Sequence, residues 1–124
     1  MILHLADIAR NAIVELVAAL IDLGPGPARI ELLAEDQTVL AVMEFSKPST
    51  ASIRDGTLTF APIAQANARA SGRAIAAHIC DADGSEVFSC DVSDFNGDAV
   101  MKLTSDRIEA GKAVSINTFT LSIP

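Results

Sequence analysis

Apolar residues near the start of the chain recur at spacings of three and four, which predicts one amphipathic α-helix. The stripe consists of Leu5, Ile8, Ala9, Ala12, Ile13, Leu16, Val17, Leu20 and Ile21. Gly24 suits the left-handed residue that often ends a helix, and Pro25 and Pro27 forbid continuation because they lack an amide donor. We expect the stripe, Leu16 included, to cover a sheet built from the rest of the chain.

The chain after this helix has the pattern of short antiparallel strands. Residues 28–34 and 38–45 are rich in Ile, Leu, Val and Phe and predict a pair. Lys47 to Thr50 interrupts the pattern, and the turn signal Asp55-Gly56 precedes a third strand at 57–60. We interpret residues 61–71 as an irregular connection, with a short helix as the alternative.

The clearest hairpin pairs residues 72–80 with 86–92 across the turn Asp81-Ala82-Asp83-Gly84-Ser85. The turn signal Asn96-Gly97 then precedes a short strand within residues 99–103.

The last segment, residues 113–123, changes its alternation phase, which predicts a β-bulge near Asn117 and Thr118. This strand ends at Pro124, and we expect it to lie at a sheet edge and to take part in association. The predicted fold is α+β: one N-terminal amphipathic helix packed on an antiparallel sheet or sandwich of roughly six or seven short strands.

Composition supports a single compact domain over residues 1–124, because a chain of 124 residues that is 50% hydrophobic is too short for two cores. Nine Lys and Arg against 16 Asp and Glu give a net charge of −7, which repels phosphate backbones and anionic lipid. We therefore expect neither nucleic acid nor a membrane as a partner. Charges also interrupt the most apolar segment, residues 5–23, so we expect no membrane span or secretory signal.

His78, Cys80 and Cys90 share the predicted hairpin and raise the question of a metal site. Pairing about Asp83-Gly84 places His78 opposite Cys90, with Cys80 diagonal on the same face. Structural zinc usually takes four ligands, so we favour two buried reduced thiols over zinc. The diagonal geometry also argues against a disulfide.

Other polar groups receive structural interpretations. For the acidic loops, we favour a role in forming turns over the binding of a calcium ion. These loops contain Asp81, Asp83, Asp91, Asp94, Asn96 and Asp98. His4 and His78 are the candidate bases at neutral pH, but no serine lies in a G-x-S-x-G elbow. Arg69 and Arg73 are expected in surface ion pairs, with anion binding as the alternative. We predict no enzyme, no cofactor, and no catalytic or metal-binding residues.

Segments at both ends of the chain and at the central hairpin resemble a family of small bacteriophage and prophage proteins. Residues 9–16, Ala-Arg-Asn-Ala-Ile-Val-Glu-Leu, are similar to the "ARNAIVD" helix that opens its members. The Asp81-to-Ser85 turn resembles the family's "DSDGT", and residues 108–116 and 119–124 resemble its approach to a proline-terminated last strand.

The resemblance implies a minor virion component of the tail, neck or head surface, located in the virion after synthesis in the bacterial host cytoplasm. Its expected partners are other virion proteins and further copies of itself, because virion parts are built by symmetric repetition. The alternative is a small non-enzymatic module that binds a carbohydrate or other ligand through loops at one end of the sheet.

Overall fold

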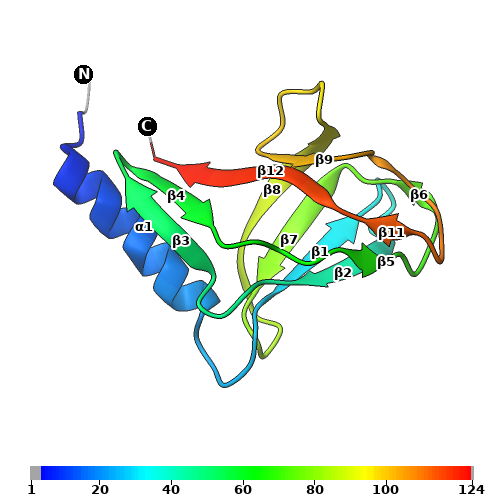
Figure 1. Ribbon diagram of the computed structural model, residues 1–124, viewed down its shortest axis with the longest axis horizontal. Coiled ribbons are helices and arrows are strands. Elements are labelled where there is room, and N and C mark those ends of the chain that lie inside the picture. The colour runs from blue at the N-terminus through cyan, green and yellow to red at the C-terminus, as the bar shows by residue number, and fades with distance from the viewer. Residues whose placement is uncertain (1–3, 124) are drawn as a thin grey trace.

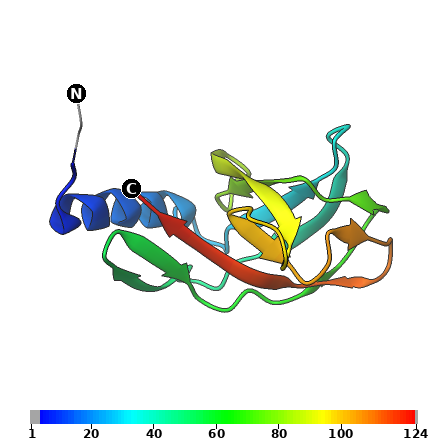
Figure 2. The ribbon, with the colours of Figure 1, turned by 90° about the horizontal axis from the view of Figure 1, so that it is seen from above.

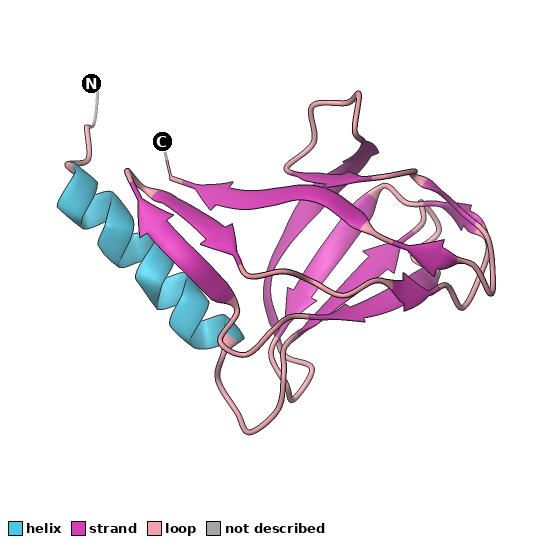
Figure 3. Cartoon of the chain, viewed as in Figure 1, coloured by secondary structure: helices cyan, strands magenta, loops and turns pink. Residues whose placement is uncertain are grey.

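A computed structural model describes residues 4–123, which form one α-helix and twelve short strands. These elements are α1 (Asp7–Ile21), β1 (Arg29–Leu33), β2 (Val39–Glu44), β3 (Thr50–Arg54), β4 (Thr57–Phe60), β5 (Ala66–Asn67), β6 (Gly72–Arg73), β7 (Ala76–Cys80), β8 (Glu86–Asp94), β9 (Met101–Leu103), β10 (Arg107–Ile108), β11 (Ala113–Val114) and β12 (Ile116–Ser122). The α+β class is confirmed, with more strands than expected (Figure 3).

Eight strands form one curled sheet in the order β2-β1-β7-β8-β9-β12-β4-β3 (Figure 1). Its neighbouring strands are antiparallel, except for β8 and β9, which run parallel over three residue pairs. Two smaller pairs, β10 with β6 and β11 with β5, complete the strand structure. The helix lies at one end of the molecule, against the β3–β4 hairpin and part of β8, and Arg10 reaches the Ile123 carbonyl just after β12 (Figure 2).

An aromatic cluster joins strands from opposite ends of the sheet. Phe45, just after β2, lies 5.2 Å from Phe60 of β4, and Phe60 stacks on Phe119 of β12 at 4.5 Å between ring centroids. Because β2 is one end of the strand order and β4 is near the other, these contacts hold the sheet in its curl. The core inside the curl also contains Ile30, Leu32, Leu40, Met43, Ile79, Met101 and Leu103.

Most local sequence predictions are confirmed. The helix ends before Gly24, whose φ is +101°, and β1 pairs with β2. The Asp55-Gly56 turn precedes β4, and β7 pairs with β8 across Asp81 to Ser85. Residues 61–71 are mainly a connection, apart from the two-residue β5. The register of β12 shifts between Ile116 and Thr118, which places the predicted bulge at Asn117.

The sequence pattern missed one strand of the sheet, and one prediction about the sheet is wrong. Thr50 to Arg54, which has Ile53 as its large apolar residue, forms β3 at a sheet edge. Its apolar signal is weak because an edge strand buries little. The last strand, in contrast, is not an edge: β12 pairs with β4 on one side and with β9 on the other.

The helix buries a different face from the one expected. Val14, Ala18 and Ile21 are buried against the hairpin and sheet, whereas Ile8, Leu16 and Leu20 face outward. Of the predicted stripe, Ile21 is buried, while Leu5, Ala9 and Val17 are half-buried. The helix is apolar on nearly all sides, so its spacing alone did not identify the packed side.

Candidate functional site

The exposed side of α1 carries most of the large exposed apolar residues of the described chain. It is lined by seven exposed apolar residues that we call the outer helix face: Ile8, Ala12, Ile13, Leu16, Ala19 and Leu20 of α1, and Leu23 two residues after its end. Among these, the five large side chains are 38% to 80% exposed, with Leu16 near the middle of the row at 63%. Surface helices normally turn such a face toward a core, so this one is available for a contact outside the chain.

Polar contacts fix the N-terminal half of the helix in this orientation. The Asn11 Oδ1 atom accepts a hydrogen bond of 2.7 Å from the Gly56 amide at the tip of the β3–β4 hairpin. Arg10 pairs with Asp7 and donates through Nη1 to the Ile123 carbonyl at 3.3 Å. Gly56 and Ile123 are distant in sequence from the helix, and they are reached from the side of the helix that faces the hairpin.

The C-terminal end of α1 is held by the segment that precedes β3. Both carboxylate oxygens of Asp22 accept from the Ser49 amide, at 3.0 and 3.2 Å. The Lys47 ammonium donates to the carbonyls of Asp22, Gly24 and Gly26 at 2.7, 3.0 and 3.2 Å. Lys47 thereby supplies the positive charge that the last turn of the helix lacks. With both ends fixed, the outer helix face cannot turn inward without breaking these bonds.

The proposed grouping of His78, Cys80 and Cys90 on one face is wrong. A bulge between Ile79 and Cys80 shifts the β7–β8 register, so that His78 lies opposite Ser89 and Cys90 lies opposite Ala77. A shift of one residue moves a side chain to the other face of a strand, which separates Cys90 from His78. No group of metal-ligating residues is present within residues 4–123.

Both cysteines are free thiols in environments that disfavour the thiolate. Burial raises the pKa of Cys90 to about 12, with a smaller contribution from the Asp91 carboxylate. Burial also raises the pKa of Cys80, and the nearby Glu31 and Glu86 carboxylates add to this effect. Neither thiol has the electropositive setting of a reactive cysteine.

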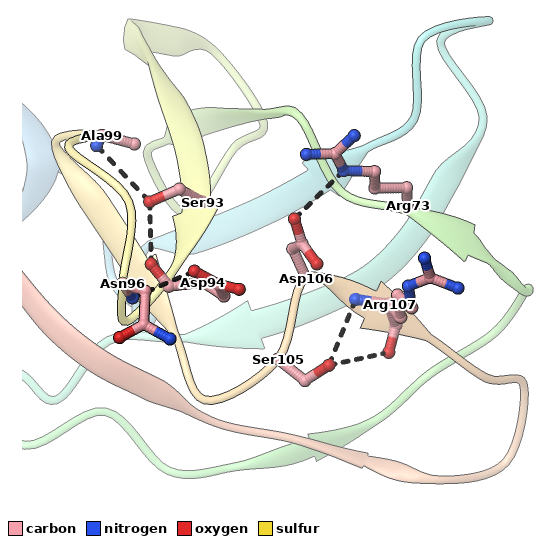
Figure 4. Close-up of polar contacts among 8 residues, drawn as sticks. All are labelled: Arg73, Ser93, Asp94, Asn96, Ala99, Ser105, Asp106 and Arg107. Atoms are coloured by element: carbon pink, nitrogen blue, oxygen red, sulfur yellow. Dashed lines mark hydrogen bonds and ion pairs between the residues drawn. The ribbon is translucent and has the colours of Figure 1, made fainter.

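The acidic loops use their carboxylates to close turns. Asp81 Oδ1 accepts from the amides of Asp83 and Ser85 at 3.0 and 2.9 Å. Asp94 Oδ1 accepts from the Asn96 amide at 3.0 Å, as Figure 4 shows. These bonds give Asp81 and Asp94 the turn-forming role expected from the sequence.

The candidate anion-binding arginines do not form a common site. Arg73 Nε donates to Asp106 Oδ2 at 3.1 Å (Figure 4), and the Arg73 side chain is mostly exposed. Arg69 is also exposed, and its backbone amide bonds to the Leu40 carbonyl. The candidate bases lie apart as well, with His4 exposed and His78 Nε2 at 3.7 Å from Glu86 Oε1.

One surface hollow of about 370 Å³ lies between residues 34–38 and 71–75. Its lining includes Glu35, Asp36 and Arg73. This volume is at the lower end of the range for small-molecule sites, about 300–1,000 Å³, and such sites are mainly apolar. The hollow therefore does not favour ligand binding over the contact role of the helix.

Sequence reasoning missed the outer helix face as a candidate site. A signal was present, since Val14 and Ala18 extend the apolar surface to the side opposite Leu16. Among residues 4–123, no helix combines the length and the apolar character that a membrane span needs. Comparisons of the chain with protein-family models, curated proteins and solved structures gave no match.

Proposed function

We propose that this chain is a non-enzymatic structural or accessory component of a bacteriophage or prophage particle, at the tail, neck or head surface. It acts through protein–protein contacts, and the outer helix face is its contact surface. The resemblance of residues 9–16, the Asp81-to-Ser85 turn and the C-terminal segment to small phage proteins supports the particle assignment. The contact role rests on the exposed apolar row of α1.

The area of this row supports a protein contact. Five large apolar side chains with 38% to 80% exposure present on the order of 400–500 Å² of apolar surface. Patches of more than a few hundred Å² on a soluble chain commonly mark interaction sites. Because both ends of the helix are tied to the β3–β4 region, this surface is already formed before a partner binds.

The proposal is tested on particles produced by the source strain and purified through a density gradient. We expect quantitative mass spectrometry to find this chain at a constant ratio to the major capsid protein across the particle fractions. A Leu16→Glu chain should be lost from the particles, whereas Phe95→Glu, at an exposed residue in the β8–β9 loop, should be retained. Absence of the wild-type chain from purified particles would contradict the proposed function.

A further inference from the structure

We propose that the outer helix face pairs with the same face of a second copy of this chain, as an antiparallel helix pair about a two-fold axis. The inference rests on the proposed function only in treating this face as a contact surface. It is argued from the spacing of the exposed residues, the alternation of their sizes and the area that they present.

The spacing of the exposed residues fits a helix as the occupant. Ala12, Leu16 and Ala19 of α1 follow one another at intervals of four and three, as in the seam of a heptad repeat. Leu23 continues the spacing two residues after the last helical residue, where its amide donates to the Leu20 carbonyl at 3.3 Å. Ile13 and Leu20 broaden the seam on one side. On the opposite side of the helix, Val14, Ala18 and Ile21 are buried against the chain's own strands. The helix therefore carries two apolar faces, and the outer one has the period of helix–helix packing.

The sizes of the seam residues favour a second copy over an unrelated helix. Small and large side chains alternate along the seam: Ala12, Leu16, Ala19 and Leu23. An antiparallel copy centred between positions 17 and 18 places Leu16 opposite Ala19 of the second copy, and Leu23 opposite its Ala12. Each leucine then meets an alanine, so the two helix axes stay at an even distance along the contact. A parallel copy would instead place leucine on leucine and alanine on alanine.

The area and charge of the face fit a weak, reversible pair. Two copies of this face present at most about 800–1,000 Å² in total, which is the size of a weak interface and not of a permanent one. The seven residues of the face are uncharged, although each chain has a net charge of −7. Pairing thus joins the acidic chains through an uncharged row. Salt should strengthen it by screening the remaining repulsion, to which the exposed Glu15 beside Leu16 contributes. The helix lies at the end of the molecule, which leaves room for the second copy (Figures 1 and 2).

Sedimentation equilibrium of the full chain tests the pairing. We expect a reversible monomer–dimer equilibrium in the micromolar range that tightens between low and high sodium chloride. Leu16→Glu should weaken dimerisation by at least about a hundredfold, which corresponds to removal of a central apolar contact and burial of a charge. Phe95→Glu, the matched control at another exposed apolar residue, should leave the dissociation constant unchanged. Leu16→Gln serves as a second variant without added charge, and circular dichroism verifies that each variant is folded.

The orientation is tested by cross-linking single-cysteine substitutions with a short bifunctional maleimide. In the antiparallel pair, the two copies of position 16 are offset by about 4–5 Å along the helix axis, and the two copies of position 23 by about 16 Å. Leu16→Cys should therefore cross-link and Leu23→Cys should not, with the wild-type chain, whose Cys80 is buried and Cys90 half-buried, as the background control.

Either of two results would overturn the inference: a wild-type chain that stays monomeric at high micromolar concentration, or a dimer that is indifferent to Leu16→Glu. Efficient cross-linking at both cysteine positions would overturn the antiparallel arrangement. A monomeric chain that is nevertheless found in purified particles would reject the pairing and keep the proposed function. A helix-paired dimer that is absent from particles would keep the pairing and reject the proposed function.

Discussion

Gly56 is the residue at which the β3–β4 turn and the helix come closest. Its φ of +75° lies in the left-handed region, and a Cβ atom added there would lie 2.9 Å from Cβ of Arg10. Its amide also donates to Asn11. Glycine is required here for two separate reasons, the backbone conformation and the space beside the helix.

A matched pair of substitutions separates these two reasons. Gly111 also has a left-handed φ, +84°, but an added Cβ would meet nothing within 4 Å. We expect Gly111→Ala to lower the free energy of unfolding by about 1–2 kcal/mol from backbone strain alone. Gly56→Ala should lower the free energy of unfolding by roughly 1–3 kcal/mol more than Gly111→Ala does, because Arg10 must also move. Urea denaturation measures both, and equal losses would contradict the close packing of turn and helix.

The two thiols should be slow to react in the folded protein. With a pKa of about 12, the Cys90 thiolate is scarce at neutral pH, so labelling with a maleimide at pH 7 should be roughly two to three orders of magnitude slower than in denaturant. Cys80, whose pKa is also raised, should follow the same pattern. Rapid labelling of the native chain would contradict the burial of these groups.

The raised pKa of Cys90 also predicts the sign of a pH effect on stability. The folded state favours the protonated thiol, so the stability that this group contributes is present below its ordinary pKa of 9.0 and is lost as pH rises toward about 12. Urea unfolding at pH 8 and pH 10 should show a larger loss of stability for the wild type than for Cys90→Ala. An identical loss in both chains would assign the alkaline effect to other groups.

At the scale of the element, α1 is an apolar helix with two different faces. The face that contains Val14, Ala18 and Ile21 packs on the β3–β4 region, and the face that contains Leu16 does not. The direction of packing is set by contacts that the helix makes through Asn11 and Asp22 with residues far along the chain.

This orientation reverses the expectation for charge substitutions in α1. Val14→Asp places a carboxylate at a fully buried position. It should lower the free energy of unfolding by several kcal/mol, which is enough to unfold a typical domain. Leu16→Asp, at a residue that is 63% exposed, should leave the thermal midpoint of the monomer nearly unchanged. Thermal melts at low protein concentration compare the two. Unfolding by Leu16→Asp under these conditions would restore the packing predicted from the sequence.

At the scale of the whole molecule, β12 links the part of the sheet that carries the helix to the rest. It pairs with β4 and with β9, and its Phe119 contributes to the aromatic cluster that holds the curl. The connection between the two regions therefore depends on the last strand of the chain.

Deletion of the residues after Asn117 should abolish folding. The deletion leaves β4 and β9 without their shared neighbour and removes the ring that stacks on Phe60. We expect the truncated chain to lack a cooperative thermal transition and to show the circular dichroism of an unfolded protein. Retention of a cooperative melt would show that the two regions hold together through other contacts.

Elements with local signals could be predicted from the sequence alone. Period and turn residues located α1, the β1–β2 pair, the β7–β8 hairpin and the bulge at Asn117. These features depend on φ preferences, on glycine and proline, and on side-chain alternation within a few residues, so a single segment contains the information.

The buried face of α1, the register of β7 and β8, and the position of β12 depend on the tertiary structure, and so does the candidate site. Because α1 is apolar on nearly all sides, its buried face was chosen by partners 45 and 113 positions away, at Gly56 and Ile123. One bulged residue set the register that separates His78 from Cys90, and the pairing of β12 with both β4 and β9 placed it inside the sheet. Each of these outcomes depends on which segments meet in space, and local periodicity is the same for either face of a helix or strand.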